Sequence, residues 1–204
     1  MHHEILSKPQ FGLLPLVKKF SSNFGLVGGT AIALHLGHRQ SIDFDLFSNK
    51  LFDNAGLRKI IVKTNKIDRV VFDEKGQYTL LINGVRFTFL EYPFHLSFHR
   101  HEAADIRLPD LFTLAAMKAY ALGRRAKWKD YVDMYFIIKK YNGLSGIVTR
   151  AMEIFGKEFN EKVFRAQLSY FDDIDFSEEV IFMRGFEVSS ALIKKSLVNF
   201  SLAK

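Results

Sequence analysis

The sequence contains no cysteine. This absence excludes a disulfide framework, a zinc site built from thiolates and a cysteine nucleophile, and it suits a reducing compartment. Long apolar runs are missing too, since none approaches the roughly 20 residues that a membrane-spanning helix needs. The first residues also lack the basic segment followed by an apolar one that directs secretion. We therefore expect a cytoplasmic protein without a membrane partner.

Acidic residues are fewer than basic ones. The sequence has 22 Asp and Glu against 29 Lys and Arg, which gives a net charge of +7. A positive surface attracts polyanions such as RNA, DNA or a nucleoside triphosphate. A basic surface without such a partner explains the charge equally well. The hydrophobic fraction of 48% and the charged fraction of 25% are those of an ordinary globular protein.

The pattern of apolar residues divides the chain into two lobes. It predicts an α+β lobe over residues 1–105 and a helical lobe over residues 106–204. In the first lobe we expect helices at residues 13–22, 30–36 and 54–64, and strands at residues 25–27, 42–47, 67–72, 78–82 and 85–92. Asn83 and Gly84, between the last two strands, predict a type I′ hairpin turn because both central positions need positive φ. The expected fold class is therefore α+β.

Two aspartates lie two residues apart in an apolar segment. Ile42, Phe44 and Leu46 alternate with Asp43 and Asp45, so a strand here has one apolar face and one face with both carboxylates. At about 3.3 Å per residue the aspartates are about 7 Å apart and repel each other unless a cation or solvent screens them. Mg²⁺ prefers a few carboxylates together with phosphate oxygens and water. The pair predicts a magnesium site, and two ordinary acids on an exposed edge strand are the alternative.

A Gly-Gly turn precedes this strand by one predicted helix. Gly28 and Gly29 follow a short strand and lead into the helix. Without Cβ atoms their backbone can approach a ligand closely, and the free N–H groups of the helix start attract anionic oxygens. Thr30 can cap the helix or bond a phosphate directly. A packing turn is the alternative, but the position beside the two aspartates predicts that phosphate and metal meet here.

Two blocks of the sequence resemble the AbiEii/AbiGii toxin-like nucleotidyltransferases. The first is Gly28-Gly29-Thr30-Ala31 followed by residues 36–47, which include the two aspartates. The second contains Lys118, then Arg125, and then Lys129-Asp130-Tyr131-Val132-Asp133, which is similar to the basic-Asp-x-x-Asp motif of that family. Together the blocks cover about residues 24–141, and the rest of the chain carries no motif of the family.

The resemblance implies a DNA-polymerase-β-like nucleotidyltransferase fold that binds Mg²⁺ and a nucleoside triphosphate and carries a helical C-terminal lobe. It also implies residue roles: Asp43 and Asp45 ligate the metal, Gly28, Gly29 and Thr30 cradle the phosphates, Lys118 contacts the triphosphate, Arg125 and Asp133 assist in nucleotide binding, and Asp130 is a further acid of the cleft. Members include toxins of type IV toxin-antitoxin and abortive-infection systems, and some relatives add nucleotides to tRNA. The implied partners are therefore tRNA or another RNA, and a cognate antitoxin.

Lys118 supplies a charge that nucleotidyl transfer requires, because fixed positive charge stabilises the departing pyrophosphate. Asp130 and Asp133 are three residues apart and share one face of a predicted helix. Asp130 can act as a base towards an acceptor hydroxyl or can orient Lys118 or Arg125, and we favour orientation. The alternative is a surface helix whose mixed charges form local salt bridges worth a few tenths of a kcal/mol each.

A third carboxylate, which enzymes of this fold commonly place on a neighbouring strand, is not evident before residue 105. Glu91 is the best candidate, because a strand end can turn its last residue towards a cleft. Thr88, on the opposite face of that strand, has the place where some relatives carry Asp. If Glu91 does not serve, the base is absent or comes from Asp130.

These motifs predict a Mg²⁺-dependent enzyme that moves a nucleoside monophosphate from a nucleoside triphosphate to a hydroxyl, on RNA such as the 3′ end of tRNA. One alternative is a nucleotide- or RNA-binding protein of the same fold with weakened or lost catalysis, since the third carboxylate is uncertain. Another is an enzyme that transfers a nucleotidyl or phosphoryl group to a small molecule or a protein.

Overall fold

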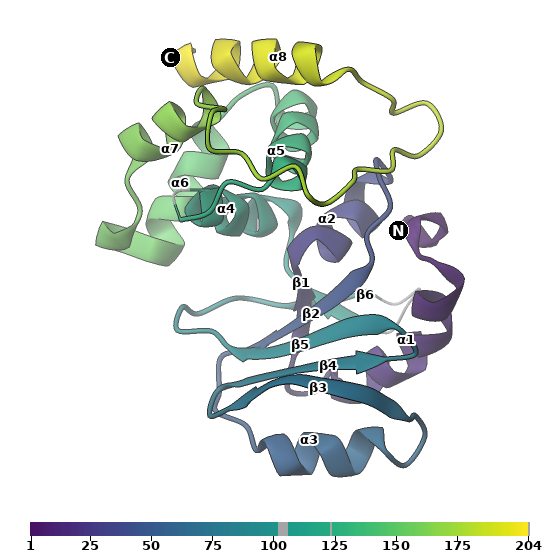
Figure 1. The fold of residues 1–204 in the computed structure, drawn as a ribbon. Helices are drawn as coiled ribbons and strands as arrows, with labels where there is room; N and C mark the ends of the chain where they lie inside the picture. Colours follow the sequence, from purple (N-terminus) through teal and green to yellow (C-terminus); the bar gives the residue numbers. More distant parts are fainter. Residues whose placement is uncertain (102–105, 123, 204) are drawn as a thin grey trace.

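The computed structural model describes residues 1–101, 106–122 and 124–203, and it shows a mixed sheet below a group of helices (Figure 1). The strands are β1 (Gly25–Val27), β2 (Asp43–Ser48), β3 (Ile67–Glu74), β4 (Gln77–Ile82), β5 (Val85–Glu91), β6 (His99–His101) and β7 (Ile106–Leu108). The α-helices are α1 (Lys8–Phe20), α2 (Gly28–Leu36), α3 (Asn54–Ile61), α4 (Leu111–Leu122), α5 (Trp128–Tyr141), α6 (Ser145–Phe155), α7 (Glu161–Leu168) and α8 (Ser190–Leu202). Two short 3₁₀ helices, η1 (His3–Ile5) and η2 (Gly156–Glu158), complete the described elements.

The main sheet has five strands in the order β1-β2-β5-β4-β3. β2 and β5 run parallel, and the other neighbouring pairs run antiparallel. The predicted α+β class is confirmed. Because β2 lies between β1 and β5, the β1–α2 turn and the middle of β5 both adjoin the residues of β2.

The apolar face of the sheet fixes the orientation of β2. Phe44 and Leu46 are buried, whereas Asp43 and Asp45, each one residue before them, are only partly buried, so the predicted alternation is confirmed from Asp43 onward. Phe87 and Phe89 of β5 extend the same buried face, and Phe89 packs edge-on against Phe20 of α1 at 4.9 Å. The carboxylates of β2 therefore lie on the face away from α1.

Ile42 departs from the prediction. It precedes β2 and is 62% exposed, so it does not continue the apolar face. The reason lies in the preceding loop, where the backbone pairs with a distant segment: Gln40 N–H donates to the Ile181 carbonyl oxygen at 2.9 Å. The chain is free to enter the sheet only after this pairing ends, so the strand begins at Asp43.

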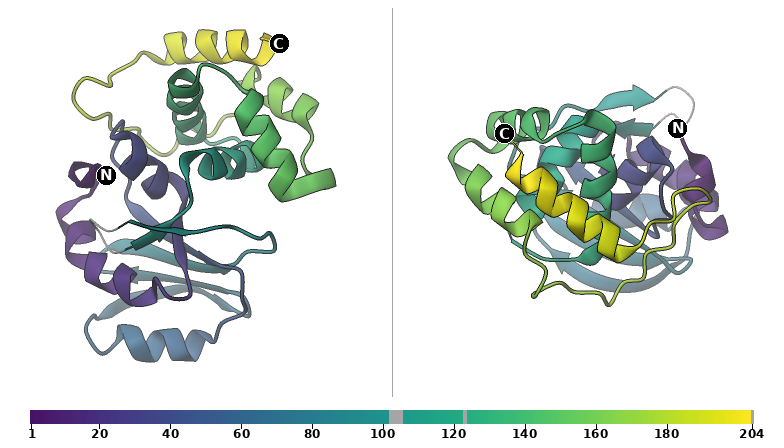
Figure 2. Two further views of the ribbon diagram at one scale, coloured as in Figure 1. Left: turned by 180° about the vertical axis from the view of Figure 1, so that it is seen from behind. Right: turned by 90° about the horizontal axis from the view of Figure 1, so that it is seen from above.

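The segment that pairs with this loop is the strap, which we define as residues 169–189 between α7 and α8. It passes α5 and the end of α2 before α8 returns across α5 (Figures 1 and 2). Its backbone is attached at two places. Asp175 bonds to Ala126 and Trp128 at the start of α5, and Met183 N–H donates to the His38 carbonyl oxygen at 3.0 Å.

The boundary between lobes, predicted near residue 105, falls within residues 102–105, which lie outside the described residues. The division into lobes at that point stays a prediction. Within residues 1–101, 106–122 and 124–203, no helix combines the length and the apolar character that crossing a membrane requires.

The β4–β5 turn confirms the predicted type I′ geometry, with φ of 51° at Asn83 and 73° at Gly84. A Cβ at Gly84 would have no atom within 4 Å, so replacement by Ala acts through the backbone alone. We expect Gly84→Ala to lower the free energy of unfolding by about 1–2 kcal/mol because of the left-handed conformation. Urea denaturation measures this change.

Gly12 provides the matched control. It lies inside α1, and a Cβ there also meets no atom within 4 Å. Gly12→Ala should raise the free energy of unfolding by about 0.5–1 kcal/mol, because Ala favours a helix interior. A loss of stability in both variants would contradict the assignment of the two backbone conformations.

Candidate active site

The two aspartates of β2 lack cationic partners. Asp43 lies opposite Arg86 of β5, and Asp45 lies opposite Thr88. Within the described part of the chain, neither aspartate side chain forms an ion pair or a hydrogen bond. Burial and the neighbouring charge of Asp43 raise the pKa of Asp45 to about 6. Burial also raises the pKa of Asp43, although Lys129 and Arg86 act in the opposite direction.

The Gly-Gly turn is shaped around Asp45. Gly28 has φ of 71°, and a Cβ on it would lie 2.2 Å from Asp45 Oδ2, so only glycine allows this approach. A Cβ on Gly29 would lie 2.6 Å from Arg39 Nη2. No side chain caps the start of α2, whose N-cap is Val27. The first N–H groups of α2 therefore lie beside the Asp45 carboxylate without a side-chain acceptor.

Thr30 does not cap α2. It is buried, its hydroxyl donates to the Asp43 carbonyl oxygen, and it lies 2.8 Å from the Ser41 hydroxyl. The prediction that Thr30 caps the helix is wrong, because the N-cap residue of α2 is Val27 and, in the described chain, no side chain caps this helix. The predicted contact of Thr30 with a phosphate stays a prediction. Thr30 instead joins α2 to the start of β2 and so fixes the backbone that carries Asp43.

Asp133 of α5 is a buried acid surrounded by cations. It accepts hydrogen bonds from Arg39 Nε at 2.7 Å, Arg39 Nη2 at 2.8 Å and His38 Nε2 at 2.8 Å, and Lys118 Nζ lies 3.2 Å away. Burial alone would raise its pKa, but Arg39 and Lys118 hold the pKa of Asp133 well below its usual range. These partners occupy both oxygens of Asp133, and its predicted role in nucleotide binding stays a prediction. Asp133 joins the α2–β2 loop to α4 and α5.

Asp130, one turn earlier, orients the two cations of the second block. Lys118 Nζ donates to its Oδ1 at 2.7 Å, and Arg125 Nε donates to its Oδ2 at 3.2 Å. Burial alone would lower the pKa of Lys118, but Asp130 and Asp133 outweigh it and raise that pKa. Asp130 has no exposed surface, so the surface-helix alternative is wrong. Orientation is the role that this geometry supports.

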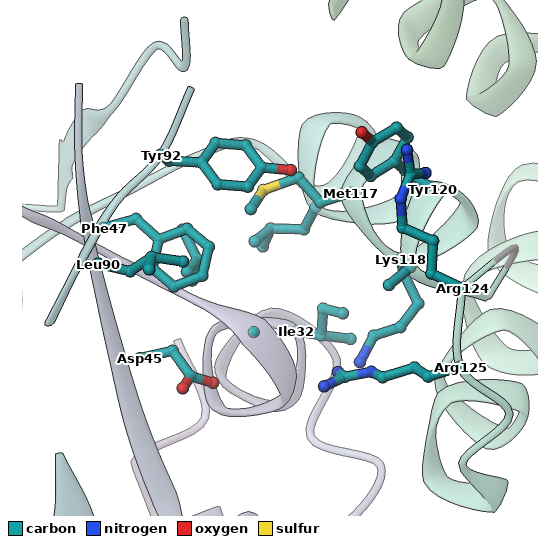
Figure 3. Close-up of a pocket in the computed structure, with 14 residues that line it drawn as sticks. Ile32, Asp45, Phe47, Leu90, Tyr92, Met117, Lys118, Tyr120, Arg124 and Arg125 are labelled. Atoms are coloured by element: carbon teal, nitrogen blue, oxygen red, sulfur yellow. The ribbon is translucent and has the colours of Figure 1, made fainter. Parts of the chain in front are cut away.

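A pocket of about 360 Å³ lies between β2 and α4. Asp45 projects from one wall, and Lys118 and Arg125 project from the opposite wall (Figure 3). The rest of the lining is mostly apolar and aromatic: Val27, Gly28, Ile32, Phe47, Leu90, Tyr92, Leu114, Met117, Tyr120, Ala121 and Arg124. One end of the pocket is thus charged and the other is suited to a flat apolar group.

Sequence reasoning missed the aromatic end of the pocket. Met117, Tyr120 and Ala121 repeat at the three- and four-residue spacing that places them on one face of α4, and Arg124 follows this helix. This helical spacing, next to Lys118, was the sequence signal from which the pocket-lining face of α4 could have been predicted. Tyr92 follows the end of β5, and nothing in the sequence alone places it opposite that helix face.

The structure does not bring Glu91 to the aspartates. Glu91 pairs in register with Ser48, three positions beyond the pair of Asp45 with Thr88. The odd spacing turns its side chain to the other face of the strand, where it lies beside Gly76. Thr88 has the place opposite Asp45. No group of three or more Asp, Glu, His or Cys suited to a metal occurs among the residues that the structure describes.

Comparisons with known proteins support the fold. No family model matches the chain. It is 33% identical over 124 residues to an uncharacterized protein of Aquifex aeolicus (strain VF5), a match that covers 59% of this chain and 60% of that protein. The chain thus spans less than two thirds of that relative.

Two solved structures share the architecture. MenT4, a nucleotidyltransferase toxin of Mycobacterium tuberculosis H37Rv, has a TM-score of 0.61 at 12% identity, covering 95% of this chain and 82% of MenT4. JHP933 of Helicobacter pylori has a TM-score of 0.57 at 16% identity, covering 96% of this chain and 91% of JHP933. At these identities the likeness shows the fold alone, which is that of the nucleotidyltransferases.

Substitution of a paired acid and of an unpaired acid of the site should change stability in opposite directions. Asp133→Asn leaves Arg39 and Lys118 buried beside a neutral amide, and we expect it to lower the free energy of unfolding by about 3 kcal/mol or more. Asp45→Asn removes a charge that burial and Asp43 disfavour, so it should raise the melting temperature at pH 7.5 in EDTA. Equal destabilisation by both substitutions, measured by thermal unfolding, would contradict this division between paired and unpaired acids.

Proposed function

We propose that the protein is a Mg²⁺-dependent nucleotidyltransferase that moves a nucleoside monophosphate from a nucleoside triphosphate to a hydroxyl group. One contrast carries the proposal: among the described residues, no cation forms an ion pair with Asp43 or Asp45, while the neighbouring acids Asp130 and Asp133 are fully paired. Paired acids orient side chains, and unpaired acids that share a face need an external cation. The nucleotidyltransferase fold supports the reaction class at the level of architecture.

The residues fit a magnesium ion. Asp43 and Asp45 supply two partly buried carboxylates on one face of β2, and Mg²⁺ characteristically takes one or two carboxylates together with phosphate oxygens and water. The lack of a larger ligand cluster in the described chain agrees with this mode of binding. When bound, the ion neutralises the phosphate oxygens and promotes attack on the phosphorus.

The other pocket residues bind and orient the triphosphate. Lys118 and Arg125 face Asp45 across the pocket, so phosphate groups between them meet cations on one side and the metal site on the other. Asp130 fixes both cations, which therefore reorganise little as negative charge develops on the departing pyrophosphate. The start of α2 offers N–H groups to the same phosphates.

The aromatic end of the pocket receives the base. Tyr92 and Tyr120 flank this end, and Met117 lies between them (Figure 3). The Tyr120 ring is already stacked against Phe155 at 4.1 Å and covered by the Arg124 guanidinium at 3.7 Å, so the base would contact Tyr92 and Met117. In the reaction, the acceptor oxygen bonds to the α-phosphorus, the bond to the oxygen that bridges to the β-phosphate breaks, and the hydroxyl proton passes to solvent.

RNA is the proposed acceptor, and the biological role is that of a toxin controlled by a cognate antitoxin in the cytoplasm. The net charge of +7 supports a polyanionic acceptor. The resemblance of the two sequence blocks to the AbiEii/AbiGii toxin-like family and the likeness in fold to MenT4, a nucleotidyltransferase toxin, support the toxin role.

A second candidate follows from Thr88. Because Thr88 stands opposite Asp45 and Glu91 faces elsewhere, no third carboxylate of the described chain joins Asp43 and Asp45 in a possible metal site. A nucleotide-binding protein that retains the fold without turnover fits this observation. Triphosphate binding without transfer to any acceptor would favour it.

The first test is transfer of label from each α-labelled nucleoside triphosphate to total tRNA in the presence of Mg²⁺. Wild-type protein should label tRNA with a preferred base, and Asp45→Asn should lower the rate at least about 100-fold because a metal ligand is lost. Asp172→Asn is the control, since it removes the same charge from an exposed site in the strap. Label transfer by Asp45→Asn at the wild-type rate would exclude the proposed mechanism.

Arg125 tests the position of the triphosphate separately. Its side chain is 54% exposed and contacts Asp130 alone among the described acids, so Arg125→Gln should leave the fold intact. We expect the affinity for the preferred triphosphate to fall about tenfold, equivalent to about 1.4 kcal/mol. Arg150→Gln, which loses a surface pair with Glu153, is the matched control. Isothermal titration compares them, and equal affinities would place the triphosphate elsewhere.

A further inference from the structure

Two lysines at the start of α5 share a single acidic partner. Lys127 is the N-cap residue of α5 and Lys129 lies in its first turn, and the ammonium groups of both bond to the Glu178 carboxylate in the strap. All three side chains are partly exposed, at 33%, 22% and 34% respectively. Two ammonium groups thus share one directly bonded carboxylate, and the further acids that act on them, Asp175 and Asp43, form no ion pair with either lysine in the described chain.

This group lies on the Asp43 side of the acid pair. The charges of Lys129, Lys127 and Glu178 all act on the Asp43 carboxylate, and Arg86, which is exposed, lies opposite Asp43 on β5. The nucleotide pocket lies on the other side, since it is lined by Asp45 and by none of these residues. A metal held by the two aspartates would thus have the triphosphate on one side and this cationic group on the other.

Glu178 holds a stretch of strap that has few other attachments. The backbone of the strap is bonded at Asp175 and again at Ile181 and Met183. Between them, residues 177–180 form no backbone hydrogen bond with another segment in the described chain. Although partial burial acts in the opposite direction, hydrogen bonds from Lys127 and Lys129 lower the pKa of Glu178 to about 2. Glu178 is therefore an anion held between two ammonium groups, as a phosphate would be.

We propose that Lys127 and Lys129 bind a backbone phosphate of the acceptor nucleic acid beside Asp43, and that Glu178 occupies this phosphate position in the free protein. The inference rests on the proposed function and specifies its acceptor as a nucleic acid strand. Phosphate contacts from lysine fix the position of a strand without reading its sequence. Such contacts would bring a terminal hydroxyl to the face of the metal site opposite the pyrophosphate.

A purely structural salt bridge is the competing explanation, and energetics argue against it as the main role. Exposed ion pairs contribute about 0–1 kcal/mol, and the strap is already bonded through its backbone at both ends of this stretch. Exchange of Glu178 for a phosphate therefore costs little stability and leaves both attachments in place.

Binding of labelled total tRNA, measured without triphosphate or Mg²⁺ at several salt concentrations, tests the proposal. Glu178→Gln should tighten tRNA binding about two- to fivefold relative to Glu179→Gln, which removes the same charge from the exposed neighbouring residue. The double substitution Lys127→Gln/Lys129→Gln should weaken binding and reduce the slope of log K against log salt by about 0.7, the value for the loss of one phosphate contact on a single strand. Lys139→Gln/Lys140→Gln on the last turn of α5 is the matched control.

The outcomes separate the possible roles. Equal tRNA affinity of Glu178→Gln and Glu179→Gln, or equal salt slopes for the two double variants, would overturn the proposal. A Lys127→Gln/Lys129→Gln protein that loses affinity for triphosphate and keeps its affinity for tRNA would do the same. If the predicted changes in tRNA binding occur but no label is transferred, nucleotidyl transfer is wrong and the phosphate site remains. Melting temperatures of all variants confirm that they are folded.

Discussion

The buried carboxylate of Asp133 determines how the two halves of the site are arranged. The carboxylate accepts hydrogen bonds from Arg39 and His38 in the loop between α2 and β2, and it forms an ion pair with Lys118 of α4. A charge with no exposed surface is tolerable only when such partners surround it. The pairing therefore fixes the loop that leads to Asp43 relative to the helices that carry Lys118 and Asp130. The separation of Asp45 and Lys118 across the pocket therefore depends on this single carboxylate.

The four acids of the site illustrate two uses of the same side chain. Asp130 and Asp133 have every oxygen satisfied and act by orienting cations. The side chains of Asp43 and Asp45 form no ion pair or hydrogen bond with the described residues, and burial raises the pKa of both. The folded chain therefore carries an unfavourable pair of carboxylates that a divalent cation would relieve. This unfavourable pair of charges is the physical observation that supports the proposed metal site on the β2 face.

Much of the local structure could be predicted, because it depends on residues close together in the sequence. Alternation predicted the faces of β2, and the Asn-Gly pair predicted the β4–β5 turn. Pairings between distant residues could not be predicted in this way. Asp133 and Arg39 are 94 positions apart, and the partner of the Gln40 backbone is Ile181. Thr30 was misjudged for the same reason, since its acceptor belongs to another element, and Glu91 was misplaced because strand register decides which face a residue occupies.

The return of the strap to residues 38–40 has a consequence for how the protein is made. Arg39 pairs with Phe182, and the His38 carbonyl accepts from Met183, so a loop near the N-terminus obtains its backbone partners from a segment near the C-terminus. On the ribosome, the sheet can form early, but this loop stays without those partners until residue 183 has emerged, more than 140 positions after the loop itself. In a chain that lacks these residues, the loop that leads to Asp43 is therefore not held in place by the strap.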